Sequence, residues 1–107
     1  MKTELDYLEQ GGGDAVFLLH STAAGNKQWR KLIDELSPHF KVIAPNLIGY
    51  GSTSHWTKQR LQTLNDQVAL LDVVFQRYEK LSIVGHSFGG SVAMMAAKNY
   101  PEKVQNL

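Results

Sequence analysis

The residues best suited to chemistry lie in the stretch 81–97, and above all in Gly85-His86-Ser87-Phe88-Gly89. An apolar, β-branched run precedes this Gly-x-Ser-x-Gly pattern, and a run with high helix propensity follows it. This order predicts a strand, a tight turn and a helix, with the Ser87 hydroxyl projecting from a strained turn. A serine presented in this way is suited to nucleophilic attack on a carbonyl carbon.

The two glycines of the pattern have a steric reason. Residues on either side of so tight a turn approach each other, and a side chain at Gly85 or Gly89 would collide. Gly89, Ala93 and Ala97 then recur every four residues, which predicts a small-residue helix face lying close to a sheet. The helix N-terminus points at the site, and its free N–H groups, beginning with that of Phe88, are placed to bind an oxyanion.

The stretch from Gly85 to Gly90 resembles the nucleophile elbow of the α/β-hydrolase fold superfamily, in its serine esterase and lipase branch. The resemblance implies an α/β fold with three layers and a mostly parallel sheet. Domains of this family are much longer than this chain. Residues 1–107 are therefore expected to form the N-terminal portion of a single hydrolase domain, an incomplete core truncated before the later strands.

A second stretch with chemical potential follows the apolar run 15–20. The family has a His-Gly pair here, and the resemblance implies that the N–H of the next residue is the second oxyanion donor; His20-Ser21 is the pair in this chain and Thr22 the donor. Ser21 replaces a glycine, so a loop that required an unusual backbone conformation there would be strained. The alternative is that Ser21 and Thr22 are simple turn residues. His20 and His86 are expected to support the loop and the elbow.

Alternating strands and helices must position these residues, and they indicate a parallel sheet with ligands bound at the C-terminal ends of its strands. Asn46 is expected to be structural, capping local backbone N–H groups. The expected elements are a half-buried strand at 3–9, a glycine turn at 11–14, a central strand at 15–20, a helix capped by Asn26 and ended by Pro38, a strand at 41–44, a loop at 45–53, an amphipathic helix at 61–78, the elbow strand at 81–84 and the approach to a further strand at 99–104.

The composition argues against several classes of partner. Eleven Lys and Arg against ten Asp and Glu give a net charge of +1 without a run of like charges, so neither nucleic acid nor an anionic membrane is an expected partner. No segment has the length and apolarity of a membrane span, and a soluble, cytoplasmic protein is expected. The absence of Cys excludes disulfides and thiolate metal sites, and neither a cofactor nor a metal is expected.

Activation of Ser87 requires a base, and in the family the acid and the His follow the serine along the chain. Only Glu102 follows Ser87 here, whereas all four histidines precede it. The triad acid and base are thus expected to be missing from this chain. His20 is the best candidate for a base within it, and His39 and His55 are expected to be exposed loop residues.

Two functions of different classes follow. The first is a serine hydrolase acting on a carboxylic ester or related small acyl substrate; a serine at the elbow argues against the epoxide-hydrolase and dehalogenase branches, which use an Asp nucleophile. The second is a non-catalytic α/β-hydrolase-like binding module or pseudo-enzyme. In either case the far side of strand 81–84 is expected to be uncovered and to favour self-association through the sheet edge.

Overall fold

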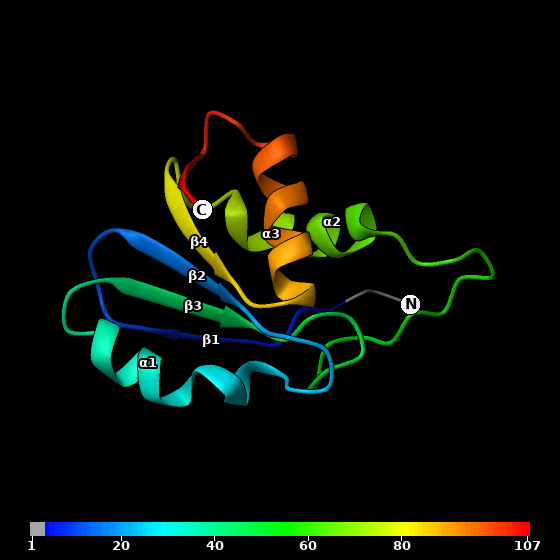
Figure 1. Ribbon diagram of the computed structural model, residues 1–107, viewed down its shortest axis with the longest axis horizontal. Coiled ribbons are helices and arrows are strands. Elements are labelled where there is room, and N and C mark those ends of the chain that lie inside the picture. The colour runs from blue at the N-terminus through cyan, green and yellow to red at the C-terminus, as the bar shows by residue number, and fades with distance from the viewer. Residues whose placement is uncertain (1–3) are drawn as a thin grey trace.

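A five-stranded sheet with helices on both faces makes up the computed structural model, which describes residues 4–107 (Figure 1). The elements are β1 (Tyr7–Gln10), β2 (Ala15–Leu19), the 3-10 helix η1 (Asn26–Trp29), α1 (Arg30–Leu36), β3 (Lys41–Pro45), α2 (Leu64–Phe75), β4 (Leu81–Gly85), α3 (Phe88–Asn99) and β5 (Val104–Asn106). The strand order is β1-β3-β2-β4-β5, and every pair except β1 with β3 is parallel. The predicted three-layer fold with a mostly parallel sheet is confirmed.

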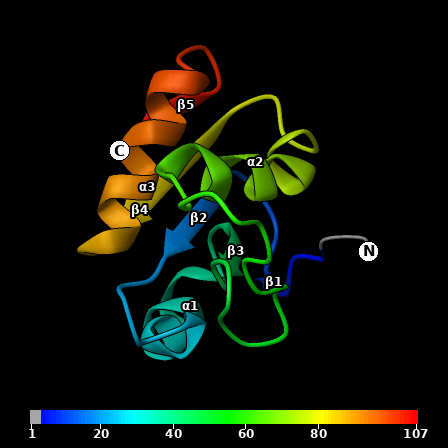
Figure 2. The same ribbon diagram turned by 90° about the vertical axis from the view of Figure 1, so that its right-hand side faces the viewer.

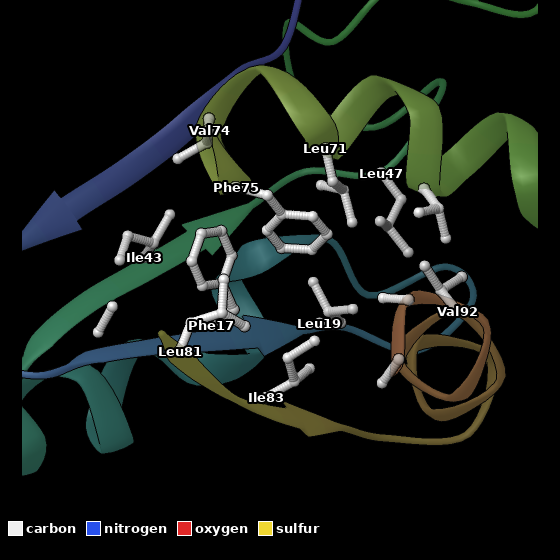
Figure 3. Close-up of a cluster of buried hydrophobic side chains, with 14 residues drawn as sticks. Phe17, Leu19, Ile43, Leu47, Leu71, Val74, Phe75, Leu81, Ile83 and Val92 are labelled. Carbon is white, nitrogen blue, oxygen red and sulfur yellow. The ribbon is translucent and has the colours of Figure 1, made fainter. Parts of the chain in front are cut away.

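The central strand β2 divides the core into two parts. Its five residues are all buried, as the continuously apolar run predicts for a strand covered on both faces. Phe17 and Leu19 face α2 and α3, whereas Val16 and Leu18 pack in the cluster that includes α1. Figure 2 shows α1 on one side of the sheet and α2 with α3 on the other. The larger cluster is drawn in Figure 3, where the rings of Phe17 and Phe75 meet edge to face with centroids 4.8 Å apart.

The N-terminal strand is shorter than expected and does not pair with β2. Within the predicted range 3–9 only residues from Tyr7 onward are strand, and Thr3 lies outside the described residues. β1 runs antiparallel to β3, which separates it from β2. The reason is that both edges of β2 are already paired with parallel strands, β3 and β4. The first strand can therefore join the sheet only at its outer edge, beside β3.

Three helix boundaries differ from the sequence expectation, and one of them is the end of α2, which falls at Phe75 rather than at Tyr78. The predicted cap at Asn26 is wrong: this residue lies inside η1, where its side-chain amide donates to the Ala44 carbonyl at 2.9 Å. The helix predicted for 61–78 begins at Leu64, because Thr63 and Asp66 form a capping box, and Leu61 is left 89% exposed.

The edge beyond the elbow strand is partly covered, which corrects a second expectation. β5 pairs with β4 at Leu81 and Ser82, so the far side of this strand is not wholly free. The three residues of β5 do not reach Ile83, and Val84 is 41% exposed. The uncovered part of β4 is therefore the half that leads into the turn.

Candidate active site

Ser87 occupies the turn between β4 and α3 in a rare backbone conformation. Its φ of 55° and ψ of −115° lie in a region that residues with a side chain seldom adopt, which confirms the predicted strain. The residue is exposed and immediately precedes the first residue of α3. The turn thus presents a hydroxyl to solvent at the N-terminal end of a helix.

The glycines around Ser87 allow this close approach. A Cβ at Gly85 would lie 2.5 Å from the Gly89 carbonyl oxygen, and a Cβ at Gly89 would lie 2.1 Å from the Leu19 carbonyl oxygen. Both distances are far below van der Waals contact, so the predicted steric need for glycine is confirmed. The His86 N–H also donates to the Leu19 carbonyl at 3.1 Å, which locks the turn against the end of β2.

Four residues of α3 face the core, and they differ from the predicted stripe. The buried set is Gly89, Val92, Ala93 and Ala96, whereas Ala97 is only half-buried. The reason is that 3.6 residues per turn make a buried face follow spacings of three and four, and a strict spacing of four drifts off it. The close packing against the sheet nevertheless depends on small residues, as expected.

The loop after β2 leaves the amide of Thr22 free. The N–H of Ser21 donates to Gln28 Oε1 at 2.8 Å, that of Ala23 to the Tyr50 hydroxyl at 2.7 Å and that of Ala24 to the Ser21 carbonyl at 3.2 Å. The Thr22 N–H donates to no atom of residues 4–107. Positive φ values in this loop, both 68°, fall on Ala23 and Gly25 and not on Ser21, so Ser21 replaces the family glycine without strain.

The Phe88 amide is also free. The next amides of the turn are used, since that of Gly89 donates to the His86 carbonyl and that of Gly90 to the Ser87 carbonyl. Phe88 N–H finds no acceptor within the described part of the chain. Unused backbone N–H groups, such as those at Thr22 and Phe88, are the kind of donor that an oxyanion hole uses.

His20 is engaged with the backbone through both ring nitrogens. Its Nε2 accepts the Leu47 N–H at 3.0 Å, so its Nδ1 carries the proton and donates to the Ser21 carbonyl at 2.8 Å. The side chain is completely buried and meets the Tyr50 ring edge to face. Burial lowers the pKa of His20, opposed by its hydrogen bond to Ser21. A neutral ring with both nitrogens in use is not available to take a proton from Ser87.

Among the described residues, none of the remaining histidines hydrogen-bonds to the serine hydroxyl. His39 and His55 are exposed, as expected, and His86 contacts Gln28 through Nδ1. In residues 4–107 no side chain hydrogen-bonds to Ser87 Oγ, and no group of three His, Asp or Glu is arranged to hold a metal ion.

Asn46 and Gln28 join the loops at this edge of the sheet. Asn46 Oδ1 accepts the Asn26 N–H at 2.7 Å, which confirms the structural role expected for Asn46. Gln28 was not singled out from the sequence: it contacts both Ser21 and His86, and no spacing pattern signals a contact between residues so distant along the chain.

Comparison with known proteins identifies the family. The family model described as "alpha/beta hydrolase fold" matches residues 14–107, and the chain therefore belongs to the α/β-hydrolase fold family. It is 31% identical to a 2-hydroxy-6-oxo-2,4-heptadienoate hydrolase of Pseudomonas putida, covering 97% of this chain and 39% of that protein. It is also 31% identical to a pimeloyl-[acyl-carrier protein] methyl ester esterase of Vibrio vulnificus, over 100% of this chain and 40% of that protein.

The structural comparison agrees. An epoxide hydrolase from Bacillus megaterium superposes with a TM-score of 0.89 at 28% identity, over 96% of this chain and 37% of that one. The chain thus spans well under half the length of these relatives. Within residues 4–107 we find no helix with the length and apolarity needed to cross a membrane.

Proposed function

We propose that this chain carries the nucleophile and oxyanion hole of a serine hydrolase that acts on a carboxylic ester or a related small acyl substrate. The observation that carries the proposal is Ser87, strained and exposed at the start of α3, with a free amide on the next residue, Phe88. A second free amide, that of Thr22, lies on the loop that Gln28 joins to this turn. The two relatives are named as a hydrolase and a methyl ester esterase.

The reaction proceeds in two halves. A base takes the proton of Ser87 as its Oγ bonds to the carbonyl carbon, and the carbonyl electron pair moves to an oxyanion that accepts hydrogen bonds from the Thr22 and Phe88 amides. The oxyanion collapses, and the alcohol leaves with the proton. Water then attacks the acyl-serine in the same way, which releases the acid and restores Ser87.

We further propose that the acid and base of this triad lie outside residues 1–107, which form the N-terminal portion of a larger hydrolase domain. His20, the in-chain candidate, has both nitrogens hydrogen-bonded to other groups. The chain alone is accordingly expected to be nearly inactive, because loss of a triad base costs several orders of magnitude in kcat.

A phosphonate probe for activated serines tests the proposal. In the whole protein the probe should attach to Ser87, and Ser87→Ala should abolish labelling and ester hydrolysis. Ser91→Ala is the matched control, since Ser91 is exposed on the first turn of the same helix and should leave both unchanged.

The 107-residue chain should label very slowly in the same assay. Rapid labelling there would contradict the assignment of the base to other residues. A whole protein in which Ser87 is never labelled would instead favour the non-catalytic binding module.

A further inference from the structure

Gln28 connects the two loops that carry the free amides. Its Oε1 accepts the Ser21 N–H at 2.8 Å, and its Nε2 lies 2.6 Å from His86 Nδ1. A backbone N–H only donates, which fixes the oxygen of the Gln28 amide toward Ser21 and the nitrogen toward His86. His86 Nδ1 is therefore the acceptor, and its ring carries a single proton on Nε2.

The backbone around Gln28 is itself tied down. The Gln28 N–H donates to the Gly25 carbonyl at 3.2 Å, and Asn26 in the same 3-10 turn reaches Ala44 and Asn46 at the end of β3. The Gln28 side chain thus extends from a fixed support. It links the end of β3 to the loop after β2 and to the turn after β4.

The backbone also joins the two segments, because the His86 N–H donates to the Leu19 carbonyl at the end of β2. Other side chains hold only one of the two loops. The Tyr50 hydroxyl accepts the Ala23 N–H but makes no bond to the turn at 86–90. Among the described residues, no side chain other than Gln28 hydrogen-bonds to both loops. Thr22 directly follows Ser21, and Phe88 lies two residues beyond His86, so a shift of either partner moves one free amide relative to the other.

We propose that Gln28 is a positioning residue that sets the separation of the Thr22 and Phe88 amides and so aligns the oxyanion hole. This inference rests on the proposed hydrolase function. Such donors act only when both lie within about 3 Å of the developing oxyanion, so a small misplacement is felt in the transition state rather than in substrate binding.

Kinetics of an ester substrate in the whole protein test this role. Gln28→Met keeps the length of the side chain but removes both hydrogen bonds, and it should lower kcat by about tenfold or more while KM changes by less than about twofold. Gln28→Glu keeps an acceptor for Ser21 but has no donor for a neutral His86, and it should lose only part of that rate. Lys27→Met, one residue away and exposed, is the matched control and should behave as wild type.

Amide resonances give a readout that does not depend on activity. Gln28→Met should shift the amide resonances of Thr22 and Phe88 together. Gln28→Glu should shift the amide resonance of Phe88 and leave that of Ser21 unchanged. An unshifted Phe88 resonance, or a kcat within twofold of wild type for a folded Gln28→Met, would overturn the inference. If Ser87→Ala stays active, the proposed function fails, and the Phe88 and Thr22 resonances of Gln28→Met still decide whether Gln28 holds the two loops together.

Discussion

At the scale of single residues, His20 shows how a position associated with chemistry can serve architecture. The ring is completely buried, and its two nitrogens bridge the Leu47 amide and the Ser21 carbonyl. Because Nε2 accepts the Leu47 N–H while Nδ1 donates to Ser21, the imidazole acts in its neutral form. A charged ring would lose the bond to Leu47, because a protonated Nε2 has no lone pair to accept the N–H.

The buried imidazole predicts a pH-dependent stability. Burial lowers the pKa of His20 from its ordinary 6.5, so the unfolded chain binds the proton more readily than the folded one. The stability that His20 contributes is present above pH 6.5 and is lost as the pH falls through the lowered pKa of the folded state. Urea melts at pH 7.5 and 5.5 should show a loss of unfolding free energy on acidification.

His20→Gln and His39→Gln separate this effect from general acid sensitivity. The loss between the two pH values should shrink in His20→Gln, whatever its absolute stability. It should persist in His39→Gln, because His39 is exposed. An equal loss in His20→Gln and wild type would refute the assignment.

At the scale of elements, the elbow depends on backbone contact between β2 and the first turn of α3. Gly89 lies so close to the Leu19 and His20 carbonyls that a side chain there has no room to move aside, since the obstacles are backbone atoms. The same contact places the free Phe88 amide next to the loop that carries Thr22.

Gly89→Val should therefore destabilise the protein by at least about 2 kcal/mol, more than an ordinary surface substitution. Gly12→Val is the matched control, because a Cβ at Gly12 meets nothing within 4 Å. Thermal or urea melts of the two variants make the comparison. Unchanged melting of Gly89→Val would mean that residues 85–90 do not form the tight turn in solution.

At the scale of the whole molecule, the sheet has an incompletely covered strand. β5 pairs with the first two residues of β4, and within residues 4–107 no strand pairs with the N–H and C=O groups on that side of residues 83–85. An exposed apolar strand edge is a template for pairing with another molecule.

The 107-residue chain is accordingly expected to self-associate in sedimentation experiments, with faster hydrogen exchange at residues 83–85 than at Val16 to Leu19. Val84→Lys should shift the distribution toward monomer, because a charge at an edge opposes strand pairing. Val73→Lys, which removes an apolar side chain that is 66% exposed on α2, should not. A monodisperse wild-type monomer would contradict this expectation and strengthen the binding-module alternative.

The features that could be predicted from the sequence are those encoded within one short stretch. Strand, turn and helix at 81–97 follow from β-branched residues, two glycines and an alanine-rich run, all within reach of a local steric argument. β2 can be predicted in the same way, because burial on both faces requires an unbroken apolar run. The elbow and the central strand can therefore be predicted from local sequence, whereas the three-layer architecture was implied by the resemblance to the family.

Only the tertiary structure decided the features that depend on residues far apart in the chain. The place of β1 beside β3, the pairing of β5 with β4 and the contact of Gln28 with His86, 58 residues away, leave no periodicity or spacing to recognise. A Gln in a turn has the same local propensity whether or not it meets a partner. Its partner depends on which strand ends the sheet brings to one edge. The order of the strands is determined by how all the elements bury their apolar faces together, and not by any one segment.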